Sequence, residues 1–147
     1  MYLMNPVSKE ERYLTFYTLG PRTVTATYHG NNSLNGSTSP GVLVLAIDFS
    51  LSASPTSQTV SGRKATYKVT VTGQGQFAGP VVMGCVGGPP STTCAVSPAS
   101  VSLSGPTADA KATVTVPAGA APGTYTITFS GTFGGVTRLA GAKLIVK

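Results

Sequence analysis

Two cysteines, Cys85 and Cys94, are the residues in this chain whose type and spacing most directly suggest chemistry. They flank a Gly- and Pro-rich loop at 86–93. A disulfide between them would link two neighbouring strands, and closing so small a ring stabilises a domain by roughly 2.5–3 kcal/mol if it is unstrained. That is a substantial fraction of the stability of a typical domain. Two reduced, buried or half-buried thiols are the alternative. A disulfide would imply an oxidising compartment.

Metal binding and cysteine catalysis need partner residues that the sequence does not place nearby. Zinc sites usually have four ligands, but the chain has one histidine and only two cysteines. A nucleophilic cysteine needs a base, and His29 lies in a different repeat. Paired-carboxylate and calcium sites need clustered acids, and no phosphate-binding loop, nucleophile elbow or HExxH motif is present. We therefore predict no catalytic residue, metal ligand or cofactor. The chain has four acids, of which the last two could contact an ion: Glu10, Glu11, Asp48 and Asp109.

Three aromatic residues are candidates for packing or for ligand contact. Tyr125 occupies a position where β-sandwiches often place a tyrosine whose hydroxyl bonds back to the backbone. A phenol that contacts a ligand is the alternative for this residue. Tyr67 alternates with polar neighbours and is expected in the core. Phe133 precedes Gly134 and Gly135, so we predict it at a loop tip as an exposed contact residue, with a place in the core as the alternative.

The elements that must position these side chains are β-strands, because apolar residues alternate with Thr, Ser and Lys at a period of two. The clearest alternation runs over 65–71 and 124–129, and no helical period occurs. About seven short strands in about 100 residues, each with one apolar face, predict an all-β, immunoglobulin-like sandwich over 47–147. The expected strand segments are 49–53 with a continuation at 59–60, 65–71, 81–85, 93–97, 101–103, 110–116, 124–129 and 136–147.

An internal repeat relates the beginning of the chain to its end. Residues 21–30 align with 122–131 without a gap, at an offset of 101 (122 − 21). The same offset places 43–45 on 144–146. Repeats of this length indicate tandem units. We interpret residues 1–46 as the truncated, C-terminal strands of a preceding repeat.

Within that partial repeat we expect strands at 22–28 and 41–46 and a short apolar candidate at 13–17. Val24, Ala26 and Tyr28 would face inward. The strand edges of a partial repeat are unpaired. Such edges pair with a second chain, fold onto the main domain or stay disordered, and the sequence leaves these outcomes open.

The net charge of +6 could attract nucleic acid or anionic cell-wall polymers, or could simply reflect the presence of only four acids. The basic residues are scattered. Only Arg63 and Lys64 are adjacent, and no aromatic stacking platform lies between the basic residues, so we predict no nucleic-acid binding. No stretch is long enough to span a membrane, and residues 1–12 contain no signal peptide. Together with the expected disulfide and the truncated repeat, this predicts a fragment or mis-started frame of an extracellular or cell-surface protein.

Several motifs occur in an order that resembles the bacterial immunoglobulin-like domains of large secreted and surface proteins. They cover 48–147 and comprise DFSLSASP at 48–55, ATYKVTV at 65–71, FAG at 77–79, the two cysteines, SP at 97–98 and GTYTI at 123–127. Residues 17–46 resemble the final strands of a related repeat. The resemblance implies that Phe77 is a packing residue and that no catalytic set is present. The chain departs from antibody domains in having no Trp.

The resemblance also implies a structural or adhesive role in a multi-domain protein. We expect a non-catalytic spacer module whose partners are neighbouring immunoglobulin-like domains. The alternative is an adhesin or carbohydrate-binding module that contacts cell-surface polysaccharide through the loops at 87–90 and around Phe133.

Overall fold

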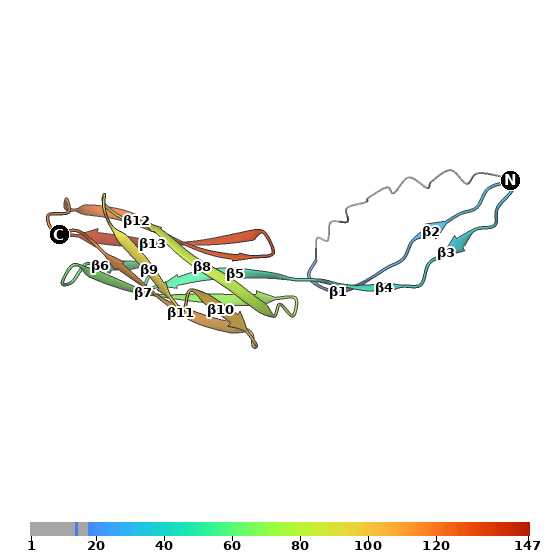
Figure 1. The fold of residues 1–147 in the computed structure, drawn as a ribbon, viewed down its shortest axis with the longest axis horizontal. Coiled ribbons are helices and arrows are strands. Elements are labelled where there is room, and N and C mark those ends of the chain that lie inside the picture. Colours follow the sequence, from blue (N-terminus) through green and yellow to red (C-terminus); the bar gives the residue numbers. More distant parts are fainter. Residues whose placement is uncertain (1–13, 15–17) are drawn as a thin grey trace, which may run out of the picture.

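The computed structural model describes residue 14 and residues 18–147. In these residues it contains thirteen strands and no helix. Nine of the strands form two facing sheets, and the other four form a long hairpin that precedes them (Figure 1). The prediction of an all-β sandwich is therefore confirmed.

One sheet has four strands, and every neighbouring pair in it is antiparallel. Along its second strand Ala65, Tyr67, Val69 and Val71 are buried, while the intervening Thr and Lys side chains point outward. This is the pattern that the alternation predicted. In spatial order the strands are β5 (Asp48–Ser54), β7 (Lys64–Gln74), β11 (Thr107–Thr115) and β9 (Thr93–Ser97).

The other sheet has five strands and one parallel pair. Its last strand, β6, runs parallel to β13, with Leu144 opposite Gln58. The other neighbours are antiparallel. In spatial order the strands are β10 (Ser100–Leu103), β8 (Gly79–Gly87), β12 (Gly123–Phe133), β13 (Val136–Val146) and β6 (Ser57–Thr59).

The core lies between the two sheets. Tyr67 of β7 packs against Phe129 of β12 with ring centroids 5.4 Å apart. Ile127 and Leu144 complete the same layer and are fully buried. Because burial of each such side chain stabilises the fold by about 1.5–3 kcal/mol, this shared layer is what holds the two sheets together.

The sandwich has nine strands instead of about seven. The strand expected at 49–53 with a continuation at 59–60 is divided between the sheets, and the separate segments expected at 93–97 and 101–103 lie in opposite sheets. After Pro55 the chain leaves β5 and joins the opposite sheet as β6, and after Pro98 it passes from β9 to β10. Proline has no N–H to continue a ladder, so it ends pairing on one sheet and the chain can cross to the other.

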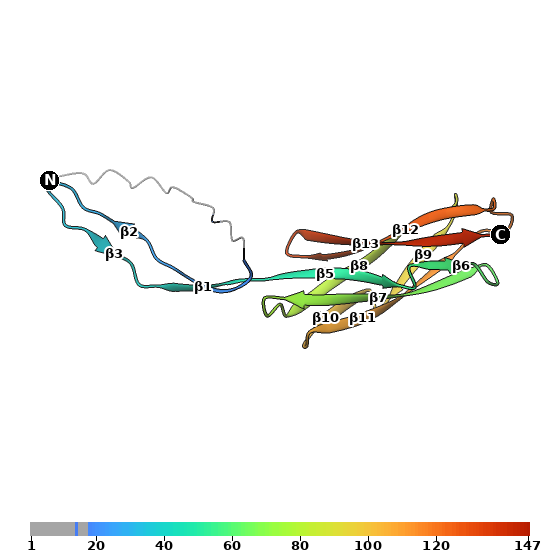
Figure 2. The ribbon, with the colours of Figure 1, turned by 180° about the vertical axis from the view of Figure 1, so that it is seen from behind.

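The hairpin extends from the sandwich along its long axis (Figures 1 and 2). The expected strand at 22–28 is interrupted at Thr25 and Ala26, and the exposure of Ala26 and Tyr28 contradicts their predicted inward orientation. No second sheet covers this part of the described chain. The strand candidate at 13–17 lies outside the described residues except for Leu14, which is not in a strand. The paired strands are β1 (Gly20–Val24) with β4 (Val42–Ala46), and β2 (Thr27–Tyr28) with β3 (Ser37–Thr38).

The hairpin repeats the β12–β13 pair with a shifted register. Gly123 lies opposite Val146, so the offset of 101 predicts Arg22 opposite Leu45, whereas Arg22 lies opposite Val44. The turn and an extra residue in the returning arm together set this register. Gly134 and Gly135, with φ of 54° and 82°, turn the chain between β12 and β13, but the hairpin turns one residue earlier, between the bridged residues Asn31 and Leu34. Turn geometry sets register in hairpins. The turn alone would place Arg22 opposite Leu43 (31 + 34 − 22), but three residues, 39–41, separate β3 from β4 while two, 25–26, separate β1 from β2, which brings Val44 opposite Arg22.

Candidate functional site

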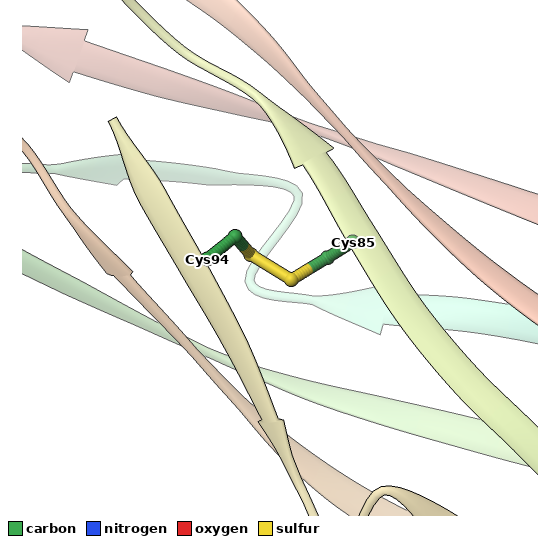
Figure 3. The surroundings of a disulfide bond; sticks show 2 residues. All are labelled: Cys85 and Cys94. Atoms are coloured by element: carbon green, nitrogen blue, oxygen red, sulfur yellow. A yellow bond between two sulfur atoms is a disulfide. The ribbon is translucent and has the colours of Figure 1, made fainter. Parts of the chain in front are cut away.

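Cys85 and Cys94 form a disulfide between the two sheets (Figure 3). Cys85 lies on β8 of the five-stranded sheet and Cys94 on β9 of the four-stranded sheet, with their Cα atoms 5.8 Å apart. Both are half-buried against the core. The expected disulfide is thus present in the structure, and it is compatible with an oxidising compartment.

The disulfide links the two sheets along one long edge of the sandwich. The edge strand β10 pairs with β8 only over residues 79–82, so Cys85 lies beyond its end. On the other side, β9 is the outermost strand of its sheet. The disulfide therefore holds the sheets together where the core has no covering strand.

The loop between the cysteines is packed rather than freely projecting. Gly87 lies so close to β12 that a Cβ atom there would stand 2.2 Å from the carbonyl oxygen of Thr126. Pro89 is buried, and its carbonyl accepts a hydrogen bond of 3.1 Å from the N–H of Thr92. Of the 87–90 loop that we expected to offer ligand contacts, only part is exposed to solvent.

An ion pair links the two sheets at the opposite edge. Arg138 of β13 donates two hydrogen bonds to the carboxylate of Asp48 on β5, at 3.1 Å from Nε and 2.7 Å from Nη2. The N–H of Phe49 donates a third, at 2.7 Å. The hydrogen bonds from Arg138 are the main cause of the lowered pKa of Asp48, and the same pairing raises the pKa of Arg138. Sequence reasoning missed this pair, because the residues lie 90 positions apart.

Phe133 is half-buried at the end of the sandwich that adjoins the hairpin, near Asp48 and Arg138. Its ring meets that of Phe77 edge to face, with centroids 4.8 Å apart, and Phe77 in turn packs on Phe49 at 5.3 Å. The ring also fills the space above Gly79, where a Cβ atom would lie 2.7 Å from Phe133 Cε2. Phe77 is buried, as expected of a packing residue. Phe133 contacts the core instead of projecting from the loop, and a role in ligand contact stays a prediction.

The base of the hairpin and this end of the sandwich form a joint, defined here by Leu19, Leu45, Ile47, Asp48, Phe133 and Arg138. These residues are among those that line an open hollow of about 420 Å³. Gly75, from the loop after β7, touches the hairpin so closely that a Cβ atom there would lie 2.5 Å from the carbonyl oxygen of Ala46. A single residue, Ile47, separates β4 from β5. The joint therefore combines a short connection with direct contacts.

The hydroxyls of Tyr67 and Tyr125 both donate hydrogen bonds to backbone carbonyl oxygens. Tyr67 is fully buried, and its hydroxyl donates to the carbonyl oxygen of Lys143 on the other sheet at 2.8 Å. Burial raises the pKa of this phenol. The hydroxyl of Tyr125 donates to the carbonyl oxygen of Ala121, four residues earlier, at 2.9 Å. These bonds satisfy both hydroxyls within the protein, which favours structural roles.

The remaining titratable residues do not converge. Within the described part of the chain, no group of three or more His, Cys, Asp or Glu side chains is arranged to hold a metal ion. The carboxylate of Asp109 accepts a hydrogen bond of 2.7 Å from Thr70 and pairs with Lys68 at 3.0 Å, and the Thr70 bond is the main cause of its lowered pKa. His29 is exposed at the far end of the hairpin. The structure does not bring it to the cysteines.

Comparisons with known proteins add no further assignment. No protein-family model matches the chain, and no curated protein matches it significantly. Among the described residues there is no helix of the length and apolarity needed to cross a membrane. The geometry of the sandwich and its joint is therefore the basis for a functional proposal.

Proposed function

We propose that residues 47–147 form an immunoglobulin-like domain that serves as a non-catalytic spacer in an extracellular or cell-surface protein. The observation that carries this proposal is the end-to-end arrangement of the hairpin and the sandwich. The tip of the hairpin and the C-terminal residue lie at opposite ends of the molecule (Figure 1). The chain thus enters the sandwich at one end and leaves it at the other, as a linear array of units requires.

The sheet order supports the immunoglobulin-like assignment. In such domains the strands of one sheet follow the order A-B-E-D and those of the other follow C-F-G. The four-stranded sheet β5-β7-β11-β9 and the central strands β8-β12-β13 of the five-stranded sheet match these orders. The bond from Tyr125 to Ala121 corresponds to the tyrosine that marks the corner before strand F. The disulfide differs from that of antibody domains, because it joins β8 and β9 instead of the B and F strands.

The joint supports a semi-rigid spacer. A connection of one residue leaves little freedom between β4 and β5. The Asp48–Arg138 pair fixes the start of β5 against β13, and Gly75 packs against the hairpin base. A series of units joined in this way would extend along one axis and hold a terminal domain away from a surface.

The second candidate is an adhesin or carbohydrate-binding module. The hollow at the joint favours it, because it places the apolar ring of Phe133 beside the hydrogen-bonding groups of Asp48 and Arg138. Binding sites commonly combine an apolar wall with a few polar groups that fix orientation. The ion pair already occupies these polar groups, so a sugar would have to compete with it.

A sedimentation assay with insoluble polysaccharides and peptidoglycan distinguishes the two candidates. The whole chain should not bind at moderate salt if it is a spacer. Binding that disappears with added salt would reflect only the net charge of +6. Salt-resistant binding that is lost in Phe133→Ala and kept in the exposed control Leu139→Ala would support the binding module, provided that both variants show the circular dichroism of the parent.

A further inference from the structure

The hairpin, residues 18–46, exposes apolar side chains that a folded domain would normally cover. In β4, Val42, Leu43 and Leu45 have exposed fractions of 62%, 71% and 42%. All five residues of β4 are apolar. Since successive side chains in a strand point to opposite faces, both faces of the hairpin are apolar at β4. An isolated two-stranded hairpin is at best marginally stable in water, so a further partner would stabilise this one.

The outer edge of β4 is open and lacks the usual protection. Among the described strands, β4 pairs only with β1. Exposed edges are commonly blocked by charged residues, prolines or bulges, and β4 contains none of these residue types. The outer edge of β1 differs, because its sequence includes Pro21 and Arg22. Of the two edges, β4 is the one that can accept another strand.

The internal repeat shows that a strand in this position takes a second partner. β13 corresponds to β4 at the offset of 101, and it pairs with β12 on one side and with β6 on the other. The contact with β6 covers Lys143 to Ile145, which correspond to Val42 to Val44 (143 − 101 and 145 − 101). In the described part of the hairpin no strand takes the place of β6.

We propose that β4 of a second copy occupies this edge, forming a two-fold symmetric dimer with antiparallel β4 strands centred on Val44. The result is a four-stranded sheet with a β1 strand at each outer edge. The electrostatics permit this pairing, because Arg22 is the only Asp, Glu, Lys or Arg residue in 18–46 and lies on β1, away from the new contact. Pro21 at each outer edge disfavours addition of a further strand, so the assembly closes as a dimer instead of growing into a filament.

Sedimentation velocity over a range of concentrations tests the proposal on the whole chain. We expect a monomer–dimer equilibrium whose dissociation constant rises at least about tenfold in Leu43→Lys, since each dimer loses two apolar contacts and gains two charges. The matched control is Leu139→Lys, on β13 of the sandwich, where the native leucine is 63% exposed. It should leave the equilibrium unchanged. A parent chain that stays monomeric to millimolar concentration, equal effects of the two variants, or assemblies larger than a dimer would overturn the proposal.

Oxidative cross-linking tests the geometry. With the two-fold axis at Val44, the two copies of Val44→Cys face each other within disulfide range. The two copies of Val42→Cys would be four residues apart along the strands, about 13 Å, and would not cross-link. Peptide mapping should find a Val44→Cys dimer with the native Cys85–Cys94 bond intact. Cross-linking of both variants would indicate parallel strands, and cross-linking of neither would exclude this edge. Either result would contradict the proposed dimer.

Discussion

Replacing Cys85 and Cys94 together by alanine removes the disulfide that joins the two sheets while keeping the β-carbons that contact the core. The bonded residues are separated by 9 positions. For a ring of this size, the loss of chain entropy in the unfolded state corresponds to about 2.5 kcal/mol at 25 °C. In a domain of about 100 residues, a loss of that size lowers Tm by roughly 10–20 °C. We expect both changes in the double variant.

Equilibrium urea denaturation followed by circular dichroism measures the change in the free energy of unfolding. The parent protein after reduction is the control, and it should match the double variant, which should itself not respond to reductant. A loss below about 0.5 kcal/mol, well under the ring-closure value, would refute the reasoning that the bond acts by constraining the unfolded chain at this open edge.

Three further predictions concern other contacts of the sandwich. Gly87→Ala should cost at least about 2 kcal/mol, because φ is 118° and the new Cβ would stand 2.2 Å from a carbonyl oxygen, whereas Gly105→Ala, with open space around it, should have little effect. Asp48→Asn should lower the free energy of unfolding by up to about 1 kcal/mol at neutral pH, since its side chain is 28% exposed. The folded pKa of Asp48 is depressed, so this difference should be complete above the unfolded pKa near 4 and fade as pH falls through the folded pKa. Tyr67→Phe should cost about 1 kcal/mol, because the hydrogen bond between the sheets to the carbonyl of Lys143 is lost.

Urea denaturation also decides these three cases. Equal stabilities of Gly87→Ala and Gly105→Ala would show that the 87–90 loop is not held against β12. If the free energies of unfolding of Asp48→Asn and the parent differ as much at pH 2 as at neutral pH, the charge on Asp48 is not the source of the difference. A Tyr67→Phe variant as stable as the parent would show that the inter-sheet hydrogen bond contributes little.

In the sandwich, the alternation of apolar and polar residues predicted correctly which face of each strand is buried, but not which strands pair. It placed Tyr67 in the core, where it is fully buried. It could not show that the chain changes sheet after Pro55 and Pro98, because a period of two says which residues share a face and not which strands pair. The hairpin shows the same limit, since Tyr28 has the alternation of an inward residue but no opposing sheet in the described chain.

The site residues that the sequence did not predict depend on contacts between distant segments. The glycines after Phe133 correctly indicated a turn, but the ring folds back because Gly79, on another strand, leaves room for it. The Asp48–Arg138 pair joins the first and last strands of the sandwich and has no local sequence pattern. The cysteines were easier to interpret, because the chain contains only two of them and each has one possible partner.

The central proposal, that this chain holds its units in a fixed end-to-end arrangement, is tested most directly by a distance across the joint. Spin labels would be attached to cysteines introduced at two exposed positions, Thr23 on β1 and Ala118 at the far end of the sandwich. Pulsed electron paramagnetic resonance then measures the distance between the two labels. Dilution with unlabelled protein removes distances between copies. We expect a single narrow distance distribution, whereas a broad one would contradict a semi-rigid spacer.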